Sequence, residues 1–149
     1  MIEVYNDTYF MKQALLEAHK AKAQGEVPIG AVVVSKQRII SRAHNSTELL
    51  TDVTAHAEIL AISAASTFLG GKYLKDCTLY VTLEPCIMCA GALAWAQLGK
   101  LVYAASDEKG GFMRYGKVLL HPKTKVEYGI LMPECSLLLK DFFEGKRVK

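Results

Sequence analysis

Apolar residues are arranged along the chain in two ways, and each arrangement predicts a different kind of element. Near the N-terminus they recur every three or four residues, which is the spacing of one helix face. These residues are Phe10, Ala14, Leu15, Ala18 and Ala21. Asn6 or Asp7 is a suitable N-cap and Gly25 follows the last of them. We therefore predict a helix that ends at about Ala23.

Short apolar runs bounded by polar residues predict strands. The runs at 29–35 and 38–44 flank a polar turn, so we expect a β-hairpin whose first strand is buried on both faces. Further apolar runs at 78–83, 101–106 and 126–131 are typical of three more strands.

Predicted helices alternate with these later strands. They cover residues 54–68, the segment from Pro85 to near Leu98, and an amphipathic stretch at 133–143. Because a hairpin is followed by alternating helices and strands, we expect a three-layer α/β/α sandwich around a mixed sheet of about five strands. No linker or repeat interrupts the pattern, so residues 1–149 are expected to form one domain.

Composition agrees with an ordinary soluble protein. Apolar residues make up 51% of the chain and charged residues 22%, which is unlike a disordered protein. Apolar runs such as 30–34 are too short to cross a bilayer, so no membrane partner is expected. The N-terminal segment lacks the basic and apolar regions of a signal peptide. We therefore expect a cytoplasmic protein with reduced thiols.

Charge is distributed unevenly along the chain. Residues 1–71 hold six Lys or Arg and seven Asp or Glu, a balance of −1, whereas residues 72–149 hold twelve and eight, a balance of +4. This excess is compatible with a polyanionic partner, but solvated lysines explain it equally well. Charge alone therefore does not predict nucleic-acid binding.

Two segments, TAHAEIL at 54–60 and TLEPCIMCAGAL at 82–93, carry the candidate chemistry. Taken singly, their polar residues have ordinary explanations. A buried histidine is usually hydrogen-bonded in a core, and a C-x-x-C pair can be redox-active or accidental. A glutamate in the first turn of a helix can simply complement the helix dipole.

Taken together, the two segments place metal ligands at two predicted helix starts. Cys86 and Cys89 face the same way on one helix, where thiolate pKa values are lowered, and His56 adds a nitrogen from the neighbouring helix. A structural zinc site would normally be closed by a fourth Cys or His, but Cys77 and Cys135 lie in other elements. Three protein ligands leave a fourth position for water, which is the catalytic arrangement. We expect one zinc ion per chain.

Glu58 lies two residues after His56, where its carboxylate can face the water without binding the metal. A carboxylate there can take a proton from water, deliver it to a ring nitrogen and later protonate a leaving amine. The arrangement therefore predicts hydrolytic deamination, with Glu58 as the catalytic proton shuttle.

The two segments also carry a family resemblance. His56-Ala57-Glu58 and Pro85-Cys86-Ile87-Met88-Cys89 match the H-x-E…P-C-x-x-C signature of zinc nucleobase deaminases. The chain thus resembles the cytidine/deoxycytidylate deaminase superfamily. The segments VPIGAVVV, AHN, TAHAEILAI, LYVTLEPCIMCAGAL and ECSLLLKDFF are similar to bacterial tRNA adenosine deaminases. The similarity covers nearly the whole chain and is weaker at 107–120.

The resemblance implies a cytidine deaminase-like fold, zinc bound by the His56, Cys86 and Cys89 side chains, and a homodimer. It also implies a set of substrate contacts: Asn45 on the target base, Val27 and Pro28 in the pocket wall, and Ala57. The terminal helix would bring Phe143 near an RNA anticodon loop. Basic residues follow it in the sequence at Lys146, Arg147 and Lys149.

Several alternatives remain open from the sequence. The segment DEKGGFMRYGKVLL departs from the family pattern, and NSTELL lacks an arginine that the family often has after the base-binding asparagine. The substrate is thus a tRNA anticodon loop or a free nucleobase, nucleoside or nucleotide such as guanine, cytosine or deoxycytidylate. A non-catalytic zinc module that binds RNA is a third possibility. Trp95 fits a dimer interface or a core, and Phe142 and Phe143 also fit core packing.

Overall fold

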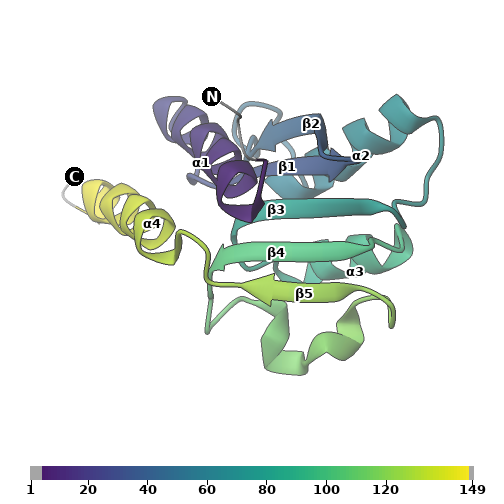
Figure 1. Ribbon diagram of the computed structural model, residues 1–149. Coiled ribbons are helices and arrows are strands. Elements are labelled where there is room, and N and C mark those ends of the chain that lie inside the picture. The colour runs from purple at the N-terminus through teal and green to yellow at the C-terminus, as the bar shows by residue number, and fades with distance from the viewer. Residues whose placement is uncertain (1–4, 148–149) are drawn as a thin grey trace.

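Five strands form one mixed sheet in the computed structural model, which describes residues 5–147 (Figure 1). They are β1 (Gly30–Ser35), β2 (Arg38–His44), β3 (Cys77–Leu83), β4 (Lys100–Ala105) and β5 (Lys125–Tyr128). The strand order is β2-β1-β3-β4-β5. β1 is antiparallel to β2 and β3, whereas β3, β4 and β5 run parallel. The carboxyl ends of the three parallel strands therefore lie at one edge of the sheet.

Helices cover both faces of this sheet. They are α1 (Asp7–Ala23), α2 (Ala57–Leu69), α3 (Ile87–Trp95) and α4 (Met132–Arg147), with two short 3-10 helices, η1 (Phe112–Tyr115) and η2 (Lys117–Leu119). α1 and α4 pack on one face, and α2 and α3 on the other (Figure 1). The three-layer sandwich with a mixed, five-stranded sheet is confirmed.

β1 joins the two layers of the core. Ala31 and Val33 pack with α2 and α3, while Val32 and Val34 pack with α1, so the strand is buried on both faces as the sequence predicts. At Gly30 a Cβ atom would overlap the backbone of α1. A glycine therefore lets α1 approach the sheet closely at this point.

The helices on the α2 and α3 side are shorter than the hydrophobic pattern predicts. α2 begins at Ala57 and not at residue 54, because the Asp52 carboxylate accepts hydrogen bonds from the Thr54 N–H and hydroxyl and His56 has extended backbone. α3 ends at Trp95 and not near Leu98, because Gln97 adopts a left-handed conformation with φ of 54°. Local turn geometry overrides apolar periodicity at both ends.

Boundaries in the C-terminal part also differ from the prediction. β5 ends at Tyr128 and not at residue 131, since Gly129 and Leu131, with φ of 105° and 60°, turn the chain into α4. α4 then continues to Arg147, beyond the predicted end at 143. None of the helices within residues 5–147 has both the length and the hydropathy that crossing a bilayer requires.

Candidate active site

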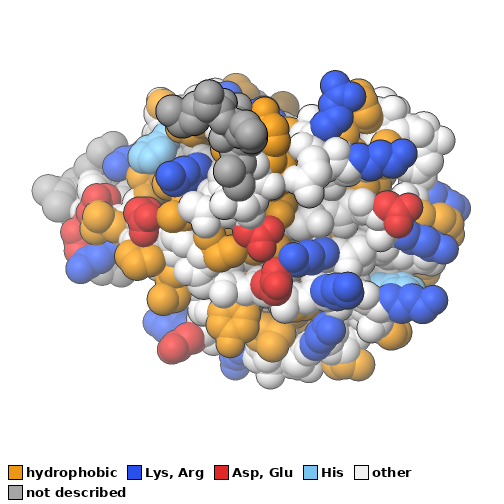
Figure 2. Space-filling model, in the orientation of Figure 1, with side chains coloured by type: hydrophobic (Ala, Val, Ile, Leu, Met, Phe, Trp, Pro, Cys, Tyr) orange, Lys and Arg blue, Asp and Glu red, His pale blue; other side chains and the backbone are white. Residues whose placement is uncertain are grey.

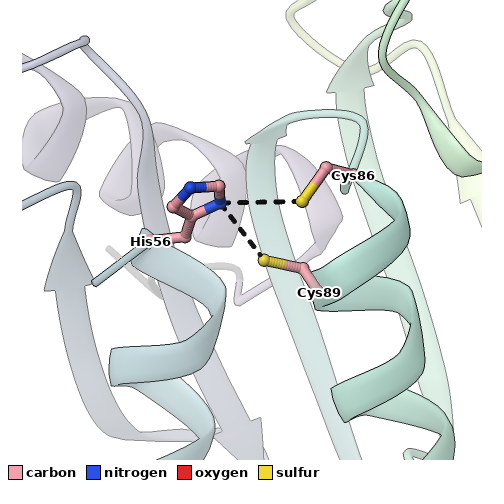
Figure 3. A group of neighbouring side chains, drawn as sticks. All are labelled: His56, Cys86 and Cys89. Atoms are coloured by element: carbon pink, nitrogen blue, oxygen red, sulfur yellow. Dashed lines mark hydrogen bonds between the residues drawn. The ribbon is translucent and has the colours of Figure 1, made fainter. Parts of the chain in front are cut away.

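The three candidate metal ligands lie at the N-termini of two neighbouring helices (Figure 3). His56 is the N-cap residue of α2, Cys86 is the N-cap residue of α3, and Cys89 lies in the first turn of α3. α3 follows the carboxyl end of β3, and α2 follows the loop after β2. The fold therefore brings together two segments that are far apart in the sequence.

The spacing of the ligand atoms fits a zinc ion. His56 Nδ1 lies 3.6 Å from Cys86 Sγ and 3.5 Å from Cys89 Sγ, and all three ligand atoms lie within 4.8 Å of one another. Bonds of about 2.3 Å to sulfur and about 2.0 Å to nitrogen at a tetrahedral angle would separate nitrogen and sulfur by about 3.5 Å. Figure 3 shows the same ring nitrogen facing both sulfurs. Three corners of a zinc tetrahedron are thus provided by the chain.

The two sulfurs differ in how readily they lose a proton. Hydrogen bonds from Cys89, together with the nearby His56, lower the pKa of Cys86 to about 5 against the effect of burial. The pKa of Cys89 is raised, because it donates to Cys86 and is buried. Cys86 is therefore the first thiolate of the pair. Metal binding would have to displace the proton of Cys89.

Cys77 and Cys135 lie outside this cluster. Cys77 is the first residue of β3 and Cys135 lies in α4; both are buried and free. Burial raises the pKa of Cys77 and raises that of Cys135 to about 12. Both residues are therefore protonated, unreactive core thiols.

Glu58 is a buried carboxyl group in the first turn of α2, with only 4% of its surface exposed. Burial raises the pKa of Glu58 to about 7. Its Oε1 atom has no hydrogen-bond partner among residues 5–147. A carboxyl group that titrates near neutral pH and has an oxygen without a partner is suited to accept a proton and return it.

Asn45 is buried beside the start of the same helix. Its N–H donates to the Ile29 carbonyl at 3.0 Å, and the next residue, Ser46, donates its N–H to Ala55, the residue before His56, also at 3.0 Å. Asn45 Oδ1 is buried and, within the described residues, lacks a hydrogen-bond partner. Buried polar atoms in protein cores nearly always have a hydrogen-bond partner. Asn45 Oδ1 and Glu58 Oε1 therefore indicate a place where a ligand binds.

The other predicted substrate contacts occupy different environments. Val27 is half-buried and Pro28 is buried, just before β1. Ala57 is fully buried in the core, so only its backbone, in the first turn of α2, remains for a substrate. Phe143 is 46% exposed but lies in α4, on the sheet face opposite α2 and α3, and is not part of the His56 cluster. Lys149 lies outside the described residues.

Sequence reasoning missed Glu84, which positions a loop beside the ligands. This buried carboxylate accepts hydrogen bonds from the Asp107 and Met113 N–H groups, each at 3.0 Å. Gly111 packs against the carboxylate and forms a β-bridge with Cys86. The available signal was a carboxylate between a buried strand and the Pro-Cys start of a helix.

Glu26 has a similar role on the other side of the site. Its carboxylate is 1% exposed and accepts hydrogen bonds from the Glu48 and Leu49 N–H groups, at 3.1 and 2.8 Å. These bonds hold the loop that follows Asn45. No local pattern in the sequence marks Glu26, because its partners lie more than twenty residues away.

Comparison with known proteins finds relatives along nearly the whole chain. A family model described as MafB19-like deaminase matches residues 5–147. A tRNA-specific adenosine deaminase of Aquifex aeolicus is 49% identical over 144 residues, which cover 93% of this chain and 95% of that protein. A structure from a study of A-to-I editing by tRNA:A34 deaminases aligns with a TM-score of 0.83 at 43% identity, covering 89% of this chain and 99% of that chain.

A guanine deaminase from Nitrosomonas europaea has the same architecture at greater sequence distance. It aligns with a TM-score of 0.81 at 26% identity, covering 95% of this chain and 86% of that chain. The five-stranded sheet with four helices is the cytidine deaminase-like α/β fold that these structures share. With its ligand set at one end of that fold and the family model spanning residues 5–147, the chain belongs to the MafB19-like deaminase family.

Proposed function

We propose that this chain hydrolyses adenosine to inosine in the anticodon loop of a tRNA. The observation that carries the proposal is a pair of buried oxygens without partners, Asn45 Oδ1 and Glu58 Oε1, beside a ligand set whose spacing fits zinc. The 49% identity to a protein named tRNA-specific adenosine deaminase supports the choice of substrate. The guanine deaminase is the more distant relative, at 26% identity.

One zinc ion per chain would be held by His56 Nδ1 and the sulfurs of Cys86 and Cys89. Zinc with an open fourth position is a Lewis acid that makes water nucleophilic near neutral pH. Because the pKa of Cys86 is already lowered, the chain presents one thiolate to the metal before binding.

Glu58 moves the protons of the reaction. Deamination breaks the bond between C6 of adenine and its amino nitrogen, forms a bond from C6 to oxygen, and releases ammonia. In this scheme Glu58 accepts a proton from the attacking water and donates it to the ring nitrogen N1. It then takes the proton of the new C6 hydroxyl group and transfers it to the departing amine, so that C6 becomes a carbonyl carbon and ammonia leaves. Its pKa of about 7 suits both acceptance and donation at neutral pH.

The surrounding residues would position the substrate. The Asn45 amide would hydrogen-bond the base after it has left its stack, since a stacked base cannot reach a buried site. Val27 and Pro28 would form the pocket wall, and the Ala57 backbone would contact the base from the start of α2. The exposed ring of Phe143 would stack on a flanking nucleotide, with Lys146 on the same helix near phosphate.

We assign the homodimer contact to the outer face of α2 and α3. Trp95 is 85% exposed, so it does not fill the core. It borders an apolar groove of about 410 Å³, whose other lining residues include Ile59, Ile62, Tyr73 and Ala92. A second copy of the chain would cover this face of the two helices whose N-termini carry the ligands. Cytoplasmic location is supported by the need for reduced thiols at Cys86 and Cys89.

Deamination of a free nucleobase is the second candidate, favoured by the guanine deaminase structure with a TM-score of 0.81. A substrate panel separates the two. Purified protein would be incubated with an anticodon stem-loop bearing adenosine at the first anticodon position, and separately with adenosine, guanine, cytosine and deoxycytidylate. We expect inosine in the stem-loop by mass spectrometry. Faster conversion of guanine or cytosine than of RNA would contradict the tRNA assignment.

Replacing Glu58 tests the proposed chemistry directly. Glu58→Gln keeps the size of the side chain but removes proton transfer, so turnover should fall by at least about 100-fold. Zinc content, measured by elemental analysis, should stay near one per chain. Glu134→Gln, which changes an exposed glutamate in α4, is the matched control and should retain activity. Turnover in Glu58→Gln equal to that control would assign the proton shuttle to another group.

A further inference from the structure

A polar cavity, apart from the candidate active site, lies at the edge of the sheet where β3, β4 and β5 begin. Its volume is about 510 Å³. The basic residues that line it come from three segments: Lys75 before β3, Lys100 in β4, and His121, Lys123 and Lys125 before and in β5. Figure 2 shows Lys and Arg side chains and a His gathered on the right-hand side of this face, where the parallel strands begin in Figure 1.

This cavity is separate from the candidate active site. Cys86 follows the carboxyl end of β3, whereas the cavity borders Cys77 at the start of that strand. A seven-residue strand rises about 3.3 Å per residue, so the two places are roughly 20 Å apart. A ligand in the cavity would therefore not compete for the Glu58 site.

The cavity carries positive charge that the chain itself does not neutralise. Lys100 is paired with Glu127 at 2.7 Å and lies 3.9 Å from Asp7. None of the ion pairs formed within residues 5–147 involves Lys75, Lys123 or Lys125, and all three side chains are exposed. Asp76 is the one acidic residue in the lining. The lining therefore favours an anion.

One further feature supplies a neutral donor to the cavity. His121 Nδ1 accepts a hydrogen bond from the Lys123 N–H at 3.2 Å, so a neutral ring carries its proton on Nε2 as a donor.

We propose that this cavity is a phosphate-binding site in which Lys75, Lys123 and Lys125 contact phosphate oxygens and His121 Nε2–H donates a hydrogen bond. Ammonium groups and an imidazole N–H are donors that suit phosphate, and the cavity has the volume of a small-ligand pocket. The site gives four of the twelve Lys and Arg residues in the second half of the chain a common location. The phosphate comes either from RNA backbone beyond the anticodon loop, which rests on the proposed function, or from a free nucleotide.

Two charge-matched double variants test this site. Lys123→Gln/Lys125→Gln removes two cations from the cavity, and Lys12→Gln/Lys22→Gln removes two exposed cations from α1. Both variants have the same net charge, so a general electrostatic effect weakens both equally. Lys123→Arg/Lys125→Arg keeps the charge and should bind like the unaltered protein. Circular dichroism would verify the fold of all three variants.

Binding is measured with three probes: a full anticodon arm across a salt series, adenosine 5′-monophosphate, and inorganic phosphate. If RNA supplies the phosphate, the cavity variant should bind the arm about 10-fold more weakly than the α1 variant. Its affinity for the arm should also depend less steeply on salt concentration, by an amount that corresponds to the loss of up to about two phosphate contacts. If a free nucleotide supplies it, the cavity variant should lose binding of the monophosphate and of phosphate, with arm affinity equal to that of the α1 variant.

Equal affinities of the cavity and α1 variants for all three probes would overturn the proposal. The outcome does not depend on catalysis, because binding of the monophosphate and of phosphate requires no turnover. Failure of the unaltered protein to deaminate the stem-loop would refute the proposed function and leave the nucleotide measurement valid.

Discussion

Four cysteines of this chain divide into two kinds by their surroundings. Cys86 lies at the start of α3, where hydrogen bonds lower its pKa to about 5, whereas burial raises the pKa of Cys135 to about 12. The pKa of Cys89 is also raised, but its sulfur lies 3.5 Å from His56 Nδ1, where a bound zinc ion would displace its proton. Among the described residues, the cluster of possible metal ligands does not include Cys135. The metal chemistry of the chain is therefore expected at Cys86 and Cys89 only.

Single replacements of cysteine check this division. Cys86→Ala should lower the zinc content well below one per chain and abolish turnover, because two protein ligands bind zinc far more weakly than three. Cys135→Ala should retain zinc, since its sulfur lies in the core on the other side of the sheet. Elemental analysis after dialysis against a weak chelator measures both. Full zinc content in Cys86→Ala would contradict the assigned ligand set.

Glu17 illustrates how a buried acid contributes to stability. Its side chain lies 2.8 Å from Lys20 Nζ and 3.2 Å from His44 Nδ1. Burial acts to raise the pKa of Glu17, but these partners outweigh burial and hold the pKa below its usual value of 4.5. The unfolded chain then binds this proton more readily than the folded chain does. The stabilisation is thus present above about pH 4.5 and is lost as the pH falls through the folded value.

Glu17→Gln should therefore destabilise the protein at pH 7 and matter less in acid. We expect a loss of about 1–3 kcal/mol in the free energy of unfolding at pH 7, the size of hydrogen bonds to a charged group. The loss should shrink as the pH falls below 4.5. Urea unfolding at several pH values measures it, with the exposed Glu144→Gln as control. A loss that is constant with pH would show that Glu17 acts through packing and not through its charge.

At the level of elements, one side chain links the metal site to the loop at 107–113. Glu84 follows β3 and holds the N–H groups of Asp107 and Met113, which come after β4. The Phe112 N–H donates to the Pro85 carbonyl at 2.9 Å, next to Cys86. This loop belongs to the segment in which the sequence departs from the family pattern, yet it is anchored beside a ligand.

Glu84→Gln should loosen this loop. The amide offers one carbonyl oxygen where the carboxylate offers two, so one of the two N–H groups loses its acceptor. Hydrogen exchange at Asp107 or Met113 should speed up by about 10-fold or more, the equivalent of about 1.5 kcal/mol for a hydrogen bond to a charged group. Glu108→Gln, exposed in the same loop, should leave exchange unchanged. Unchanged exchange in Glu84→Gln would mean that the loop is held by other contacts.

At the level of the whole molecule, several large apolar side chains are exposed on α2 and α3. Trp95, Phe68 and Ile87 are 85%, 68% and 50% exposed on these helices. Large exposed apolar surfaces are typical of protein interfaces. The same two helices carry the candidate ligands at their N-termini, so a dimer formed there would place two sites near one interface.

Trp95→Glu should convert the proposed homodimer into a monomer, because a carboxylate buried in an apolar interface has no partner. Light scattering after size exclusion measures the mass. Leu16→Glu, which changes a residue of α1 that is 52% exposed on the opposite layer, should remain dimeric. A monomeric unaltered protein, or a dimeric Trp95→Glu protein, would remove the interface from this face.

The sequence by itself was sufficient for features that depend on neighbours along the chain. Short apolar runs predicted the five strands, and three- to four-residue spacing together with helix start and stop residues predicted the four α-helices, because these signals depend on neighbours along the chain. The H-x-E and P-C-x-x-C motifs predicted that His56, Glu58, Cys86 and Cys89 would act together. Their helix-terminal positions followed from the same local patterns.

Tertiary structure decided the features that depend on residues far apart. The roles of Glu26 and Glu84 emerged only from backbone groups more than twenty residues away. The sequence left Trp95 in a core or at an interface, and the packing around α3 leaves its side chain 85% exposed. The basic cavity likewise arises because parallel strands begin at one edge, which gathers lysines from segments that no local pattern connects.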